Sequence, residues 1–481
     1  MTDPAASDEA MTQMSDVPGS LKPFIVLSSE GRIDLPGLST SADVAEVVQA
    51  AVEDNPENGL VIFFHGGLTS ESAGIDIVRS LKNAYRGQAK TYPIFFVWKS
   101  GLDETLEAML KRKLTLIGNE KYFKVLKERI PRWSARHISL STNEEQTAQV
   151  PGIATVEAEL SADIAMDPQF QEALQEVFEA AYGAGRGLST NVILLPDSGA
   201  LNRMFPEGAL LSDKRVLWRS PKLIRFLAEI VLNYLERIRY HRTHGLEPTI
   251  VEEILCAIYL NAVGADIWED MKKATERAFE HGAFAGTVLM EQLGKRADSG
   301  RSFNKITLIG HSAGAIYVSN FIRHAAETLP NLEFDVIFLA PAITYDNVSK
   351  LLSLNPMRIR NFRMFSMFDH YESNDQLVTG VYVRSLLYFI SGVLERDRLE
   401  DKPIFGMQRF LEHVPVFDPT GVPNIDVCRR FLESKLHRTV WSVMDGEPAG
   451  LNSDATTHGG FATEKVTLVS VVFILTHGFG L

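Results

Sequence analysis

The apolar residues of this chain gather in short unbroken runs rather than in strict alternation. Two early runs, 60–64 and 93–98, are apolar on both faces, which is typical of strands buried inside a parallel sheet. Helical spacing over 72–85 separates them, so the pattern predicts a β-α-β unit. Later runs of the same kind predict further strands at 334–340, 362–368 and 439–443.

A further apolar run, 306–309, leads directly into the motif G-H-S-A-G at 310–314. A helical pattern continues at 321–324, so the expected order is strand, tight turn and helix. This context is typical of a nucleophile elbow, where the serine needs small neighbours because the strand and helix backbones nearly touch. The pattern therefore makes Ser312 the candidate nucleophile.

The long interval 99–304 breaks this alternation, although one crossover helix is enough to join two parallel strands. A helical pattern over 266–293 can supply that crossover. The remainder, 101–264, is predicted to be an inserted helical region, whose clearest helix, 222–239, carries a single apolar stripe. The closing segment 461–475 fits either a helix or a strand because its apolar run is rich in β-branched residues.

These elements predict an α/β fold with a mostly parallel sheet and helices on both faces. We expect the core to comprise 21–100 and 265–481, with 101–264 as a helical lid or cap between the second recognised strand and the nucleophile strand. Residues 1–20 are polar, acidic and rich in small side chains, and they predict a disordered tail.

A serine nucleophile needs a base that accepts its proton, and on such elbows the chain order is serine, acid, histidine. His458 follows the last predicted strand by a Gly-rich loop and is the first candidate. His477 is the alternative, and it would be favoured if 466–475 formed the final strand. His311 is a weaker rival because its place beside the nucleophile aims it away from the hydroxyl.

The acid is expected in the loop after the strand at 362–368. Asp375 is the first candidate, and Asp369, which lies nearer the end of that strand, is the alternative. Glu372 is a third carboxyl group in the same loop. Acidic residues are also common in loops and helix caps for local hydrogen-bonding reasons, so the pattern alone leaves these alternatives open.

The reaction also needs donors for the oxyanion. The backbone N–H of Ala313 is one candidate, because the residue after the nucleophile commonly supplies it. Gly66 or Gly67, at the end of the run 60–64, is the candidate for the second donor, since glycine lets a backbone approach a ligand closely.

Together these motifs resemble the α/β-hydrolase superfamily, over about 58–100 and 280–475. The stretches 96–101 and 373–377 are also similar to a bacterial branch of uncharacterised esterase/lipase-like hydrolases. The resemblance implies that Ser312 is the nucleophile, Asp375 the acid and His458 the base. The long insertion departs from the family's compact pattern, and insertions of this kind often act as lids over the site.

Composition narrows the class of partner. The chain has 481 residues and a formal net charge of −13, which argues against nucleic acid or an anionic membrane as its main partner. Its 2 cysteines, Cys256 and Cys428, give no disulfide framework, so a reducing cytoplasm is expected. The run 466–475 is too short to cross a bilayer, so no transmembrane segment is expected. The basic-ended helix at 222–242 fits a lid better than a peripheral membrane contact.

Neither a G-x-x-x-x-G-K phosphate loop nor an H-E-x-x-H zinc pair occurs, so we expect no metal and no organic cofactor. The sequence predicts a serine hydrolase that cleaves a carboxylic ester of a small-molecule acyl substrate. The same residues fit a thioesterase, amidase, peptidase or acyltransferase. A non-catalytic interaction protein that uses the insertion as a binding surface is the alternative of a different class, and the oligomeric state is not predicted.

Overall fold

The computed structural model describes residues 18–66, 70–99, 106–137, 150–182, 198–204, 220–300, 303–397, 400–411 and 422–480. Most of the tail predicted at 1–20 lies outside these ranges, and so does Gly67 of the candidate oxyanion loop.

A seven-stranded sheet in the order β1-β3-β2-β4-β5-β6-β7 forms the centre of the molecule. Each pair of neighbouring strands is parallel, which confirms the predicted α/β class and parallel sheet. The first strand, β1, lies outside the predicted set because its run is short and ends in two serines. The strands are β1 (Ile25–Ser29), β2 (Leu60–Phe64), β3 (Tyr92–Lys99), β4 (Ile306–His311), β5 (Phe334–Leu339), β6 (Ile359–Met367) and β7 (Thr439–Ser442).

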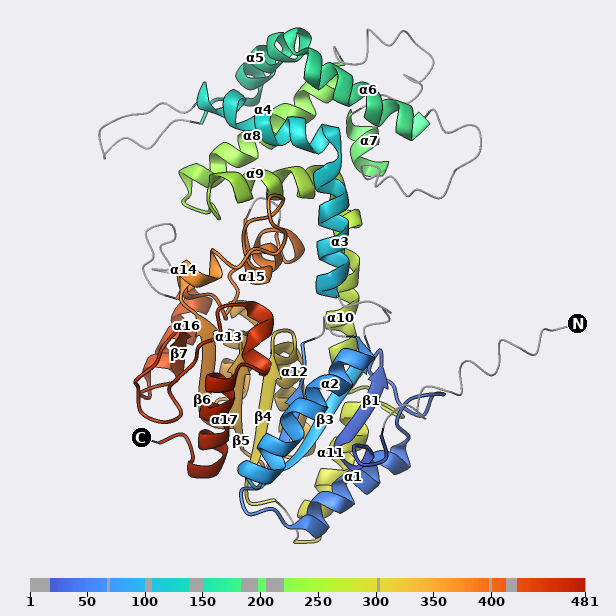
Figure 1. Ribbon diagram of the computed structural model, residues 1–481, viewed down its shortest axis with the longest axis vertical. Helices are drawn as coiled ribbons and strands as arrows, with labels where there is room; N and C mark the ends of the chain where they lie inside the picture. Colours follow the sequence, from blue (N-terminus) through green and yellow to red (C-terminus); the bar gives the residue numbers. More distant parts are fainter. Residues whose placement is uncertain are drawn as a thin grey trace, which may run out of the picture.

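Helices cover both faces of this sheet (Figure 1). Because both faces are covered, every residue of β2, β4 and β5 is buried, as the unbroken apolar runs require. One layer contains α1 (Ser41–Asp54), α11 (Ala285–Asp298), α12 (Gly314–Thr328), α13 (Tyr345–Leu354) and α16 (Pro423–Glu433). The other contains α2 (Glu71–Lys82), the π-helical turn η5 (Asn83–Gln88) and α17 (Lys465–His477).

A group of helices lies beyond the carboxyl ends of the strands, and α3 and α10 run between it and the sheet (Figure 1). Within this group α4 packs against α6, α8 and α9, and α5 packs against α8. The helices are α3 (Leu106–Asn119), α4 (Lys121–Ala135), α5 (Ile153–Met166), α6 (Pro168–Tyr182), α7 (Ser198–Met204), α8 (Pro221–Arg239), α9 (Leu246–Ile254) and α10 (Ala265–Arg277).

Two details differ from the sequence expectations. The helix predicted over 266–293 is two helices, α10 and α11, because the chain turns between them through Gly282 at φ +110°. The ambiguous closing segment is helical: the Glu464 side chain accepts the N–H groups of Val466 and Thr467 and so begins α17. Short helical pieces complete the carboxyl half, namely α14 (Asp369–Glu372), α15 (Leu386–Phe389), η10 (Ile390–Leu394), η11 (Gln408–Phe410) and η12 (His458–Ala462).

Within the described residues, one helical stretch, His458–His477, is long and apolar enough to cross a membrane by length and composition alone. Core helices of soluble proteins meet the same criterion, and Val471, Ile474 and Leu475 of this stretch are buried against the rest of the protein. The stretch is therefore weak evidence for a membrane span, and no clear transmembrane segment emerges from the described part of the chain.

Candidate active site

Ser312 lies on the sharp turn between β4 and α12. Its backbone has φ +54°, a left-handed conformation that is uncommon for a residue with a side chain. Its N–H donates to the Leu339 carbonyl at 2.9 Å, which fixes the turn against β5. Glycine is required on both sides: a Cβ at Gly310 would lie 2.8 Å from the backbone of α12, and one at Gly314 would lie 2.1 Å from the Phe64 carbonyl oxygen.

His458 meets this serine from a turn far along the chain. The Ser312 Oγ and His458 Nε2 atoms are 2.8 Å apart, and only 2% of Ser312 and 4% of His458 remain exposed. Burial, and then the neighbouring His311, lower the pKa of His458 to about 3. The imidazole is therefore neutral near pH 7, and its Nε2 can accept the serine proton.

Asp375 contacts the same histidine, but at its backbone. Its Oδ2 accepts the His458 N–H at 2.9 Å. The ring Nδ1 of His458 is buried and has no hydrogen-bond partner within the described residues. Burial raises the pKa of Asp375, and the bond from the His458 N–H opposes that rise. The carboxylate therefore holds the histidine loop, while the second ring nitrogen remains unpaired.

The other two carboxyl groups of this loop have different partners. Asp369 accepts the Tyr388 hydroxyl at 2.6 Å. Glu372 is 1% exposed and accepts the Ser385 hydroxyl. Burial raises the pKa of Glu372 to about 8, so this carboxyl is largely protonated at pH 7. Of the three candidate acids, Asp375 is the one that contacts His458.

Neither of the two rival bases accepts a hydrogen bond from the Ser312 hydroxyl. His477 is exposed at the end of α17 and lies against Phe473. In the same helix the Leu475 carbonyl accepts a hydrogen bond from the ammonium of Lys305, which directly precedes β4. This end of α17 therefore lies near the amino end of β4, whereas Ser312 follows its carboxyl end. His311 donates its Nε2 proton to the His458 carbonyl at 3.2 Å, which ties the nucleophile turn to the histidine loop.

One candidate oxyanion donor lies on the elbow, next to the nucleophile. Ala313 is the N-cap residue of α12, and its N–H has no hydrogen-bond partner within the part of the chain that the structure describes. Gly66 packs against the nucleophile, since a Cβ there would lie 3.2 Å from the Ser312 Cβ. Gly67 is outside the described residues, so the second donor is left to Gly66 or its neighbour.

His65 supports this loop, a contribution that the sequence reasoning missed. The Trp98 backbone N–H donates to its Nε2 at 3.1 Å, so the proton resides on Nδ1, which donates to the Gly66 carbonyl at 2.7 Å. Burial lowers the pKa of His65 to about 4, which keeps the ring neutral. A histidine at the end of one buried strand and a tryptophan at the end of its neighbour were the available signal.

Comparison with protein-family models, with curated proteins and with solved structures gives no match to this chain. Among the described residues, no group of three or more His, Cys, Asp or Glu side chains is arranged to hold a metal ion. A function must therefore be argued from the serine, the histidine and their surroundings. A strained serine bonded to a neutral, buried imidazole beside an unpaired helix N–H is suited to nucleophilic attack on a carbonyl carbon.

Proposed function

We propose that this protein is a serine hydrolase that cleaves a carboxylic ester of a small-molecule acyl substrate. The observation that carries the proposal is the 2.8 Å contact between Ser312 Oγ and His458 Nε2, made by a serine at φ +54° on a strand-to-helix turn. A serine held for structural reasons would have no need of this backbone strain or of a buried imidazole.

In this proposal His458 takes the Ser312 proton as the oxygen attacks the substrate carbonyl carbon. The N–H of Ala313 and a second N–H from the Gly66 loop stabilise the oxyanion. His458 then gives its proton to the leaving alcohol, and an acyl-enzyme remains. Water, deprotonated by the same imidazole, attacks the acyl carbon and releases the acid and the free serine. Asp375 is proposed as the acid that steadies the imidazolium.

The resemblance to α/β-hydrolases is part of the same proposal, with 101–264 as a cap over the site. The parallel sheet, the elbow after β4 and the helices beyond its carboxyl edge support this assignment. Ligands of open α/β sheets bind at that edge. The burial of Ser312 and His458 is consistent with a substrate that must pass beneath covering segments.

The first test is labelling with a fluorophosphonate probe, read by intact mass and peptide mapping. We expect one adduct on Ser312 in the native chain, no adduct in Ser312→Ala and much slower labelling in His458→Ala. Ser80→Ala, at an exposed serine of α2, is the matched control and should label like the native protein.

Protein that labels is then screened against ester, thioester and amide substrates of matched acyl chain, because the same residues serve each of these chemistries. An ester preference is the expected result. A folded native protein that gives no adduct would overturn the proposal and would favour the interaction protein on a hydrolase scaffold.

A further inference from the structure

His458 reaches Ser312 from a turn that is otherwise open to solvent. Thr456, Thr457 and Gly459 are exposed, whereas His458 between them is only 4% exposed. Gly459 has no positive φ, and a Cβ built there would meet nothing within 4 Å, so neither conformation nor crowding requires a glycine. A glycine beside the base widens the range of backbone conformations open to the turn. The position of the imidazole therefore depends on contacts made from outside the turn.

Those contacts all reach a single residue. Among the described residues, the hydrogen bonds that join 456–459 to segments distant in the chain all involve His458. Asp375 accepts the His458 N–H at 2.9 Å, and the Nε2–H of His311 donates to the His458 carbonyl at 3.2 Å. The peptide groups before and after the His458 Cα are thus each held by one side chain, while the imidazole contacts Ser312.

His311 is well placed to hold this carbonyl. It is the last residue of β4, directly before the nucleophile, so the sheet fixes its backbone. Its side chain is buried, and burial lowers the pKa of the ring, which is therefore neutral near pH 7. A carbonyl can only accept a hydrogen bond, so the single ring proton resides on Nε2. The ring also stacks on that of His458, with centroids 5.7 Å apart and an interplanar angle of 29°.

We propose that His311 is a positioning residue for the base: it fixes the His458 carbonyl while Asp375 fixes the His458 N–H. Together these two contacts keep the His458 Nε2 at the Ser312 hydroxyl. The inference rests on the proposed function, in which His458 takes the Ser312 proton. His311 exchanges no proton with Ser312, so the histidine of the G-H-S-A-G motif contributes to the reaction through the base and not as a base itself.

The test compares His311→Phe with His311→Gln in the hydrolysis of 4-nitrophenyl butyrate by the full chain. Phenylalanine keeps a ring beside His458 but removes the donor, so kcat should fall by about tenfold to a hundredfold, because a small displacement of the base weakens the transition state. KM should stay within about twofold of the native value, because the base serves acylation and deacylation alike. Glutamine has an amide N–H that can donate to the same carbonyl, so it should recover most of the lost kcat.

A second variant, Gly459→Ala, separates positioning from a loss of packing. An alanine methyl has open space at this position and restricts the backbone of the turn. In the His311→Phe background it should therefore raise kcat by about threefold or more, with Gly459→Ala alone as the reference. Urea unfolding of each variant shows that the compared proteins are folded.

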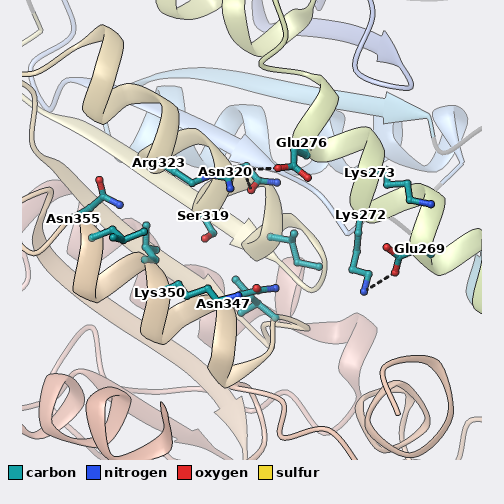
Figure 2. A pocket seen from close by; sticks show the side chains of 14 residues that line it. Glu269, Lys272, Lys273, Glu276, Ser319, Asn320, Arg323, Asn347, Lys350 and Asn355 are labelled. Atoms are coloured by element: carbon teal, nitrogen blue, oxygen red, sulfur yellow. Dashed lines mark hydrogen bonds and ion pairs between the residues drawn. The ribbon is translucent and has the colours of Figure 1, made fainter. Parts of the chain in front are cut away.

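The matched control is His324→Phe, the same exchange in the last turns of α12. The preceding residue, Arg323, lines a separate cleft and pairs there with Glu276 of α10 at 3.0 Å (Figure 2). The His324 ring stacks on Phe279 with centroids 4.9 Å apart, so the control also replaces a stacked imidazole. Its kcat should stay within about twofold of the native value.

A native kcat in His311→Phe, with Ser312 still labelled by the fluorophosphonate probe, would overturn the inference and leave the proposed function intact. Loss of kcat that neither His311→Gln nor Gly459→Ala recovers would also overturn it, because His311 would then act through packing alone. Native protein that takes no label would overturn the proposed function, and this inference with it.

Discussion

The unpaired Nδ1 of His458 is the residue-scale feature with most consequence for catalysis. Without an anion beside the ring, burial holds the pKa of His458 at about 3, so an imidazolium formed during the reaction would be costly. A carboxylate at Nδ1 would stabilise that cation. Asp375 already accepts the backbone N–H of the same residue, so its carboxylate is held beside this histidine and is the one expected to make this second contact.

We therefore expect Asp375→Asn to reduce kcat by about a hundredfold or more, because the imidazolium loses its counter-charge. Asp369→Asn should reduce kcat by less than about tenfold, because that carboxylate bonds to Tyr388 rather than to the base. Turnover per labelled serine is the measurement, so that unfolded protein does not count. The reverse ranking would transfer the acid role to Asp369.

Glu372 offers a second residue-scale prediction, based on stability. Burial raises its pKa from 4.5 to about 8, so the folded chain retains a proton that the unfolded chain releases between these values. The free energy of unfolding of the native protein should fall relative to that of Glu372→Gln as pH rises from 4.5 to 8. The difference in pH slope should correspond to the release of up to one proton on unfolding. Urea unfolding at several pH values measures this slope.

The matched control for that titration is Glu433→Gln, at an exposed residue of α16. Its unfolding free energy, plotted against pH, should run parallel to that of the native protein. If native and Glu372→Gln curves also stay parallel, Glu372 is charged in the folded state. It would then compete with Asp375 for the role of the acid.

At the scale of elements, Arg384 connects the helices beyond the sheet with the loop of Asp375. Its Nε donates to the carbonyl of His244, which precedes the N-cap residue of α9, at 2.7 Å. Its Nη1 donates to the Ser373 carbonyl at 3.0 Å. The Leu377 N–H returns a bond to the Arg384 carbonyl at 2.7 Å. Both sides of Asp375 are thus held by one arginine, so the helical region contributes to the position of the acid.

Arg384→Ala should lower kcat by about tenfold to a hundredfold with a smaller effect on KM, because a displaced acid weakens the transition state more than substrate binding. Arg384→Lys should recover only part of the loss, since an ammonium cannot span both carbonyls as the guanidinium does. Arg225→Ala, at an arginine of α8 that is 63% exposed, is the control. A change in KM alone would mean that Arg384 acts on substrate binding.

The sequence predicted elements best where one local pattern decided them. The short unbroken apolar runs at 60–64 and 306–309 predicted buried strands, because a strand in a sheet covered on both faces is apolar on both sides. The closing helix stayed ambiguous because its β-branched residues fit either structure, and the Glu464 cap decides between them. The Asp375 contact with a backbone N–H depends on how two distant loops meet, which no local pattern records.

At the scale of the whole molecule, a buried ionic cluster joins the helical region to the carboxyl half of the chain. His244 lies between two carboxylates: its Nδ1 is 2.7 Å from Glu252 and its Nε2 is 3.0 Å from Asp401. Glu252 also pairs with Arg237 of α8 at 2.8 Å and accepts the Tyr382 hydroxyl at 2.5 Å. His244, Glu252 and Asp401 are each no more than 1% exposed. The attraction between these opposite charges therefore offsets the free-energy cost of removing them from water.

Removing one charge from this cluster should destabilise the protein by about 3 kcal/mol or more at pH 7, because the remaining partners stay buried without compensation. Glu252→Gln is the sharpest variant, since it keeps the shape of the side chain. Glu247→Gln is the control: it lies on the same helix, is 54% exposed and pairs with Lys127, so its cost should stay within about 0.5 kcal/mol. Urea unfolding at fixed pH measures both.

The pH dependence separates a charge effect from a packing effect. Burial alone would raise the pKa of Glu252, but the charges of His244 and Arg237 outweigh it and lower the pKa from 4.5 to about 2. A carboxylate with a lowered pKa stabilises the fold above pH 4.5, and this contribution is lost as pH falls toward 2. The difference in unfolding free energy between the native protein and Glu252→Gln should therefore become smaller as pH falls over that range. If the difference in unfolding free energy stays constant with pH, the destabilisation comes from packing. The contact between the helical region and the carboxyl half of the chain would then not depend on the charge of Glu252.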